Sequence, residues 1–219
     1  MAILCADQDL LFIMAPHTGC TAVGETLRHE LGGAFLPDKD IRGKDGSMVV
    51  PRKHSQLKDL MEHGLVTPAM RRRLVVASTI RNPFDALVSH YAKVQDRYAK
   101  DPGRRPASTQ ATRAFESWLL YRFRPPLSAR LRGREAEELV RWTLGAEYVM
   151  RYERLQADFD GLMQRLGVDR HIEIVRTNVT EQRKRRPYQE FYTPRARRLV
   201  EELFADDLDQ FGYRFEPQD

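Results

Sequence analysis

The feature that most constrains the fold is a short, uninterrupted apolar run, Leu10–Ala15, which ends at Pro16. A run of this length without polar alternation is typical of a strand buried on both faces, as in parallel sheets. Small and polar residues follow at positions 17–21, and helical periodicity then covers 22–31 until two glycines end it. The segment therefore predicts a buried strand, a tight loop and a helix in succession.

The same pattern recurs later in the chain. A second buried strand is predicted over 74–80 and ends at Arg81, and Pro83 is well suited to the first position of a helix over 84–98. Further along the chain we expect a weaker strand over 148–151, a helix over 155–166 and a last long helix over 194–211. Strands that alternate with helices predict a three-layer α/β fold with a short, mainly parallel sheet and helices on both faces. In such sheets, ligands bind beyond the carboxyl ends of the strands.

Length and composition limit the class of protein. The chain has 219 residues, 42% of them hydrophobic, which suits one α/β domain over 1–219. The two cysteines, Cys5 and Cys20, are too few for a disulfide framework, so we expect a reducing, cytoplasmic location. Because no Cys/His cluster has metal-ligand spacing, no metal site is expected. Neither a signal peptide nor a membrane-spanning segment is predicted.

The loop after the first strand is a candidate anion site. A tight loop that opens a helix directs main-chain N–H groups at one spot, where the helix dipole adds positive potential. Thr18 and Thr21 could add hydroxyl donors, although a plain strand-to-helix turn capped by threonine explains the loop equally well. The loop is not a Walker A motif, because no lysine precedes Lys39, which argues against an ATPase or nucleotide kinase. The net charge of +5 suits an anionic ligand, nucleic acid or an acidic membrane alike.

The second candidate motif follows the second predicted strand. Arg81 stands at the end of that strand, and Ser89 lies eight residues later, about two turns into the next helix. A guanidinium and a hydroxyl placed in this way could hold one phosphate from two sides. Taken alone, the segment is more often explained without a ligand, by an arginine at a strand end and a serine that faces solvent. His90, on another face of the same helix, is predicted to pack.

The two motifs together resemble those of the sulfotransferases that use 3′-phosphoadenosine-5′-phosphosulfate (PAPS), especially the branch of carbohydrate sulfotransferases and related bacterial enzymes. In that family a loop of the form P-K-T-G-[GC]-T-[ST] holds the 5′-phosphosulfate, and Pro16-His-Thr-Gly-Cys-Thr-Ala22 is similar to it. The family segment R-N-P-[FW]-[DE]-x-[LV]-x-S-x-Y holds the 3′-phosphate and matches Arg81–Tyr91. The resemblance extends over Leu10–Phe215 and implies a P-loop, nucleotide-kinase-like fold.

The resemblance also implies which residues bind PAPS and which catalyse. The implied PAPS contacts are His17, Thr18, Gly19, Cys20, Thr21, Ala22, Arg81, Ser89, Thr180 and Lys184. His17 occupies the position of the family lysine and is a second catalytic candidate, because a protonated imidazole supplies both a donor and a charge. His54 resembles the family's general base, although a histidine near a helix start can simply be exposed. Cys20 is predicted to be a small packed thiol.

The predicted function is transfer of a sulfuryl group from PAPS to a hydroxyl or amine of a small-molecule or carbohydrate acceptor, by in-line displacement without a metal. A small-molecule kinase would share the architecture but would need Mg²⁺ and usually the Walker lysine. A non-catalytic protein that binds nucleotides or nucleic acid agrees with the net charge and with His17, and its binding to nucleic acid would weaken steeply with salt. We do not expect nucleic acid or a membrane as a partner.

Overall fold

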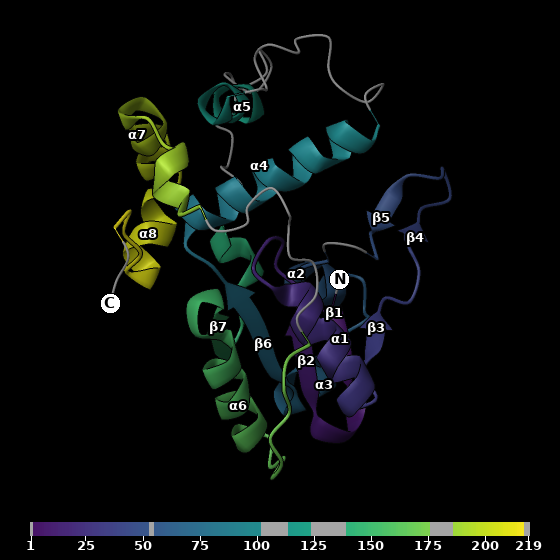
Figure 1. Ribbon diagram of the computed structural model, residues 1–219. Helices are drawn as coiled ribbons and strands as arrows, with labels where there is room; N and C mark the ends of the chain where they lie inside the picture. The colour runs from purple at the N-terminus through teal and green to yellow at the C-terminus, as the bar shows by residue number, and fades with distance from the viewer. Residues whose placement is uncertain (1, 53–54, 102–113, 124–138, 176–185, 217–219) are drawn as a thin grey trace. The chain divides into compact units, whose positions relative to one another are not determined.

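The computed structural model describes residues 2–52, 55–101, 114–123, 139–175 and 186–216 (Figure 1). The chain divides into two compact units, each built from two separate stretches of sequence. Unit 1 comprises residues 1–81 and 139–178, and unit 2 comprises residues 82–138 and 179–219. The single domain expected over 1–219 stays a prediction, and each unit is described by itself.

A five-stranded sheet in the order β3-β1-β2-β6-β7 forms the centre of unit 1. Its strands are β1 (Ala2–Cys5), β2 (Leu10–Ile13), β3 (Ala34–Leu36), β6 (Val75–Ile80) and β7 (Tyr148–Arg151). The strands β2, β6 and β7 run parallel to one another, whereas β1 is antiparallel to both β2 and β3. The α/β class is thus confirmed, and the sheet is mixed, with three adjacent parallel strands at its centre and one edge.

Strand β1 was not among the predicted strands, and it is the reason why the sheet is less parallel than expected. A short 3-10 turn, η1 (Ala6–Gln8), connects it to β2, and Asp9 closes that turn in the left-handed conformation at φ 47°. Aspartate tolerates this conformation better than most residues do. The polar residues Asp7 and Asp9 therefore belong to the turn of a β-hairpin, in which β1 pairs with β2 from Ala2–Ile13 to Cys5–Leu10.

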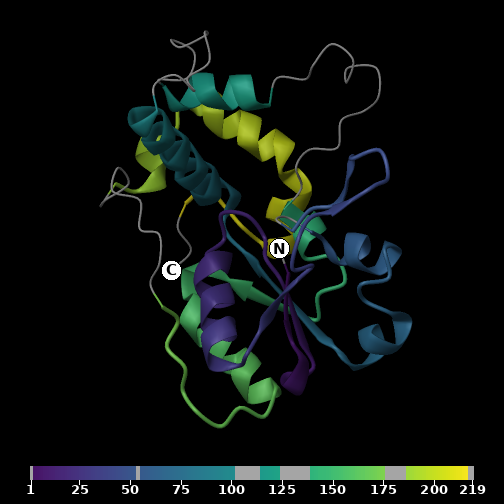
Figure 2. The same ribbon diagram turned by 90° about the vertical axis from the view of Figure 1, so that its right-hand side faces the viewer.

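Helices cover both faces of the sheet in unit 1, as Figure 2 shows. Side chains of β2 alternate between the faces, so that Leu10 and Phe12 join one core while Leu11 and Ile13 join the other. The first core is closed by α1 (Cys20–Glu30) and α6 (Leu155–Arg165), and the second by α2 (Leu57–Glu62). This arrangement confirms the three layers.

The remaining elements of unit 1 are short. They are the hairpin β4 (Ile41–Arg42) and β5 (Met48–Val50), α3 (Pro68–Arg73), and the 3-10 turns η3 (Leu139–Trp142) and η4 (Tyr152–Arg154). Val50 and Leu60 belong to the same core cluster, so the end of the hairpin and α2 pack together on one face. The predicted elements at 10–15, 22–31, 74–80, 148–151 and 155–166 are all present within two residues of their expected ends.

Unit 2 consists of helices. They are α4 (Pro83–Lys100), α5 (Phe115–Arg122), the 3-10 turn η6 (Tyr188–Phe191), α7 (Pro194–Leu203) and α8 (Ala205–Phe211). Helix α4 packs against α5, α7 and η6. The single long helix expected over 194–211 is wrong, because Phe204 leaves helical geometry at φ −120° and separates α7 from α8. The ring of Phe204 is buried and makes an edge contact with Phe123, with the ring centroids 5.9 Å apart. This contact stabilises the interruption between α7 and α8.

Candidate nucleotide site at the sheet edge

Three adjacent parallel strands of unit 1 each deliver a candidate site residue at the carboxyl end. Strand β2 leads into the loop at residues 16–19, β6 is followed by Arg81, and β7 is followed by Tyr152. Since β2 pairs with β6 and β6 with β7, these three positions lie along one edge of the sheet. Ligands of α/β proteins bind at this edge.

The loop between β2 and α1 turns sharply at two residues. His17 has a φ of 65° and Gly19 a φ of 80°, both in the left-handed region. A Cβ atom at position 19 would lie 2.9 Å from Tyr152 Cδ2 and 3.0 Å from Leu155 Cδ2, so the main chain passes closely over these side chains. Glycine is therefore required at this position both by conformation and by space. His17, in contrast, carries a side chain in a conformation that few non-glycine residues adopt.

Thr18 fixes the loop from inside. Its side chain is completely buried, and its hydroxyl donates a hydrogen bond of 2.8 Å to Ala15 O. The Thr18 and Thr79 hydroxyl oxygens are 2.5 Å apart, so Thr79, which lies on β6, is the donor of this second bond. The Thr18 hydroxyl is thus engaged within the fold, and its role as a donor to a bound anion stays a prediction.

The first turn of α1 presents main-chain N–H groups without an acidic neighbour. Gly19 is the N-cap, with no side-chain cap, and the first turn of α1 has no acidic residue. Gly19 O accepts hydrogen bonds from the N–H groups of Ala22 and Val23. Thr21 is exposed, whereas Cys20 is half-buried and packs against the core, as predicted for a packed thiol. The positive end of the helix dipole is therefore not neutralised by an acid in this turn.

Arg81 connects the loop to Tyr152. Its side chain is buried, with only 4% exposed, and its Nη1 donates a hydrogen bond of 3.2 Å to His17 O. The guanidinium carbon lies 3.8 Å from the centre of the Tyr152 ring, a close cation–π contact. Because a guanidinium stays protonated at any physiological pH, a permanent positive charge is held beside the loop. The loop, Arg81 and Tyr152 together form a candidate site for an anionic group.

Tyr152 is a candidate site residue that the sequence analysis did not identify. It is 39% exposed, it contacts the main chain at Gly19, and it stacks under Arg81. The sequence did contain a signal, because Tyr152 directly follows a predicted parallel strand and ligands bind beyond the carboxyl ends of such strands.

The other predicted site residues lie in unit 2 or outside the described residues. Ser89 is buried on α4 and belongs to unit 2, whereas Arg81 ends the first stretch of unit 1, so their joint hold on a phosphate stays a prediction. His54, Thr180 and Lys184 lie outside the described residues. His90 makes an edge contact with Trp118 at 5.2 Å, which confirms that it packs.

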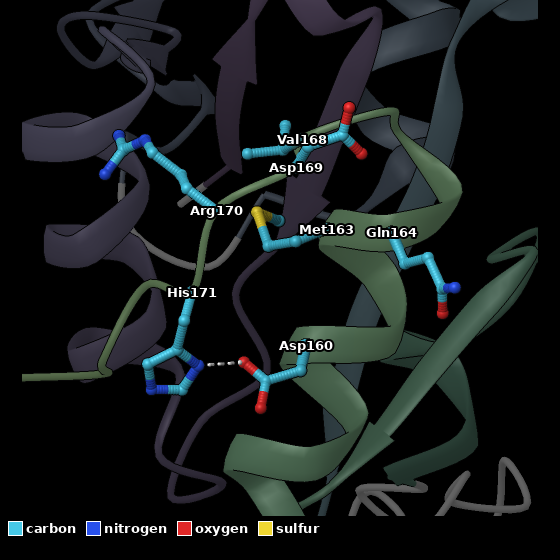
Figure 3. A pocket seen from close by; sticks show the side chains of 7 residues that line it. All are labelled: Asp160, Met163, Gln164, Val168, Asp169, Arg170 and His171. Carbon is cyan, nitrogen blue, oxygen red and sulfur yellow. Dashed lines mark ion pairs between the residues drawn. The ribbon is translucent and has the colours of Figure 1, made fainter.

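A cavity of about 310 Å³ in unit 1 lies elsewhere (Figure 3). It is lined by the C-terminal half of α6 and by residues 168–171, and none of the predicted site residues borders it. In Figure 3, His171 and Asp160 point toward one another, and their Nδ1 and Oδ1 atoms are 3.3 Å apart. Because α6 starts after the carboxyl end of β7 and runs back along the sheet, this cavity lies toward the opposite end of unit 1.

The fold and the loop define a class of protein: an α/β protein with a P-loop-like strand-loop-helix, a geometry that suits a phosphate group. Residues 1–214 match the family model described as "Sulfotransferase family", and the chain therefore belongs to the sulfotransferase family. It is a transferase of the PAPS-dependent type, with the P-loop-like fold of that family. A search of curated proteins and a search of solved structures gave no match.

Two further findings concern the described residues only. Within them, no helix is both long and apolar enough to cross a bilayer. Among the same residues, no group of three or more histidine, cysteine or acidic side chains is placed to hold a metal ion.

Proposed function

We propose that this protein transfers the sulfuryl group of PAPS to a hydroxyl or amine of a small-molecule or carbohydrate acceptor by in-line displacement. The observation that supports this proposal is the meeting of the β2–α1 loop, Arg81 and Tyr152 at one edge of the sheet, in a chain of the sulfotransferase family. In the reaction, a bond forms between the acceptor atom and sulfur while the bond from sulfur to the 5′-phosphate oxygen breaks. The acceptor's proton passes to a base.

The loop would hold the 5′-phosphosulfate. Main-chain N–H groups at 17–21 and the exposed Thr21 hydroxyl are the donors that this geometry offers. Since the Thr18 hydroxyl is engaged with Ala15 and Thr79, we expect only the main-chain N–H of Thr18 to reach the anion. Cys20 and Ala22 would contribute through the same helix start and through small side chains that admit the phosphate.

Charge on the departing oxygen would be stabilised mainly by His17 and by the loop amides. Such a group accelerates the reaction because the charge grows in the transition state. His54 would take the acceptor's proton, since a histidine base functions near neutral pH. Arg81 and Ser89 would hold the 3′-phosphate, and Thr180 and Lys184 would complete the nucleotide contacts.

The proposal is tested by the melting temperature with 3′-phosphoadenosine-5′-phosphate (PAP), the product, and with AMP, which lacks the 3′-phosphate. A ligand at one hundred times its dissociation constant adds about 2.7 kcal/mol to the stability. For a chain of this size, that stabilisation raises the melting temperature by roughly 5–10 °C. We expect this shift with PAP and a much smaller one with AMP at the same concentration.

The matched variant is Ser89→Ala, which should reduce the shift with PAP toward that with AMP and leave the AMP shift unchanged. Equal shifts with PAP and AMP in the wild-type protein would contradict the assignment of a 3′-phosphate site. Release of PAP from PAPS that depends on an added alcohol or amine then establishes transfer and identifies the acceptor.

A further inference from the structure

In unit 2, the segment at Arg214–Phe215 is bound to the residues that begin α4. The side chain of Asn82 bonds both to the start of α4 and to Arg214. Its Oδ1 accepts a hydrogen bond of 3.1 Å from Phe84 N and so caps α4, while its Nδ2 donates a hydrogen bond of 2.8 Å to Arg214 O. The cap of the helix and the attachment of the C-terminal segment thus depend on the same carboxamide.

Tyr188, in the 3-10 turn η6, joins the same network. Its hydroxyl donates to Phe215 O at 2.5 Å and accepts from Asn82 Nδ2 at 3.4 Å. Gln189 Nε2 reaches the same Phe215 carbonyl at 3.5 Å. The carbonyl groups of Arg214 and Phe215 are therefore held by side chains, in place of the partners that a helix or a sheet would provide.

The ring of Phe84 is enclosed by aromatic side chains from the same segments. Its centroid lies 5.1 Å from that of Phe215, 5.5 Å from that of Tyr192 and 6.5 Å from that of Tyr188. The Tyr192 hydroxyl also donates to Phe84 O at 3.0 Å. The Arg197 guanidinium lies 4.5 Å from the centre of the Phe215 ring. Phe84 itself is only 1% exposed, so the packing around it is complete.

All these contacts meet at residues 82–84, directly after Arg81 and at the start of the helix that carries Ser89. Ser89 lies six residues beyond Pro83, about 9 Å along the helix axis. A change in the direction of α4 at its first turn therefore displaces Ser89.

We propose that Asn82, Tyr188 and the segment Arg214–Phe215 form a C-terminal anchor that positions α4 so that Ser89 meets the 3′-phosphate of the nucleotide. The anchor residues touch no substrate in this proposal, and they act through α4. The inference rests on the proposed function, because Ser89 has a ligand to meet only if the nucleotide carries a 3′-phosphate. Without the anchor, α4 samples several directions, and the apparent affinity falls in proportion to the fraction of molecules that remain competent.

Two variants test the anchor while leaving the helix and the aromatic packing in place. Tyr188→Phe keeps the ring and removes the hydroxyl, and Asn82→Ser keeps a neutral N-cap oxygen and removes the donor to Arg214. We expect each variant to bind PAP about three- to tenfold more weakly, the range for loss of one or two hydrogen bonds, as measured by calorimetry. AMP binding should change less than about twofold, because AMP has no group for Ser89 to contact.

The matched control is Phe204→Leu, which alters another buried aromatic contact of unit 2. It should lower the melting temperature and leave the ratio of PAP to AMP affinity unchanged. If Tyr188→Phe and Asn82→Ser weaken PAP and AMP equally, or leave the ratio at its wild-type value, the anchor has no positioning role and the proposal is overturned.

Hydrogen exchange without nucleotide separates failure of the anchor from failure of the proposed function. In Tyr188→Phe, the amides of the first two turns of α4 should exchange faster than in the wild type, relative to those of α6 in the same molecule. Unchanged exchange overturns the anchor, whatever the nucleotide results are. If wild-type protein binds PAP no better than AMP, the proposed function fails, and faster exchange in Tyr188→Phe still supports the control of α4 by the anchor.

Discussion

Replacing Gly19 with alanine should disrupt both the loop and its hold on the nucleotide. Placing alanine in the left-handed conformation costs roughly 1–2 kcal/mol, and the reduced freedom of the unfolded chain returns about 0.4–1 kcal/mol. In addition, the new Cβ would lie 2.9 Å from Tyr152 Cδ2 and 3.0 Å from Leu155 Cδ2. Forcing such contacts apart costs about 1–3 kcal/mol. We therefore expect Gly19→Ala to lower the free energy of unfolding by about 1–5 kcal/mol.

Gly32 provides the matched control for this prediction. Its φ is 62°, close to the 80° of Gly19, but no atom lies within 4 Å of a Cβ built at position 32. Gly32→Ala therefore carries the conformational cost without the steric one, and we expect a loss of stability of about 0–1.6 kcal/mol. The difference between the two variants measures how closely the loop passes over Tyr152 and Leu155.

The assay is urea unfolding of both variants, followed by calorimetric titration with PAP. Gly19→Ala should bind PAP at least about tenfold more weakly, since relief of the clash moves either the loop or Tyr152, whereas Gly32→Ala should bind normally. The reasoning is refuted if the two variants lose equal stability, because the close approach at Gly19 would then have no energetic effect. It is equally refuted if Gly19→Ala binds PAP with wild-type affinity.

Substitutions at three other residues test separate parts of the molecule. His17→Ala should lower kcat more than PAPS affinity and His17→Lys should preserve or raise kcat, whereas normal turnover of His17→Ala would show that His17 takes no part. His54→Ala should lower kcat with an alcohol acceptor about a hundredfold or more and remove the acidic limb of the pH profile, and a wild-type rate would place the base elsewhere. Burial raises the pKa of the Cys5 thiol to about 11 from an ordinary 9.0, so the unfolded chain loses this proton first and stability falls between pH 9 and 11. Urea unfolding of Cys5→Ala should show a smaller fall by about 2–3 kcal/mol, and an identical fall would contradict the burial argument.

The elements that the sequence predicted correctly are those with long or unbroken apolar patterns. Strand β2 is buried and entirely apolar, and β6 is apolar at four of its six residues, so both patterns are visible without knowledge of the partner strands. The elements that were missed have two to four residues in a strand or six to eight in a helix, as in β4, α2 and α5. Such strands contain only one or two repeats of the two-residue alternation, and such helices contain about two turns, so the contacts of these elements decide their conformation.

The candidate site could be predicted only as a set of positions. The two motifs identified the loop and Arg81 because a strand end followed by a helix has a recognisable pattern. They did not identify Tyr152, which comes close to Gly19 only because β7 takes the place next to β6 in the sheet. The pairings of β2 with β6 and of β6 with β7 join residues more than 60 positions apart, and periodicity does not report them.

The motifs also do not distinguish side chains that would contact a ligand from those that stabilise the surrounding structure. Thr18 is a small polar residue of the loop, and its hydroxyl is engaged with Ala15 and Thr79. Asn82, directly after Arg81, caps α4 and binds Arg214. A substitution at either position would therefore weaken nucleotide binding by displacing the loop or α4. Its effect alone would not reveal contact between the side chain and the nucleotide.

The pairing of β2 with β6 sets the positions of the loop and Arg81 together. Ile13 is the register partner of Ser78, and the Ser78 hydroxyl donates to Ile13 O at 3.0 Å. One residue further along β6, the Thr79 hydroxyl bonds to Thr18, and two residues beyond Thr79 the chain reaches Arg81. Because side chains alternate along a strand, a slip of one residue would turn Thr79 away from the loop and displace Arg81 from His17 O. The geometry of the candidate anion site is therefore a consequence of strand register, which the burial of β2 and β6 enforces.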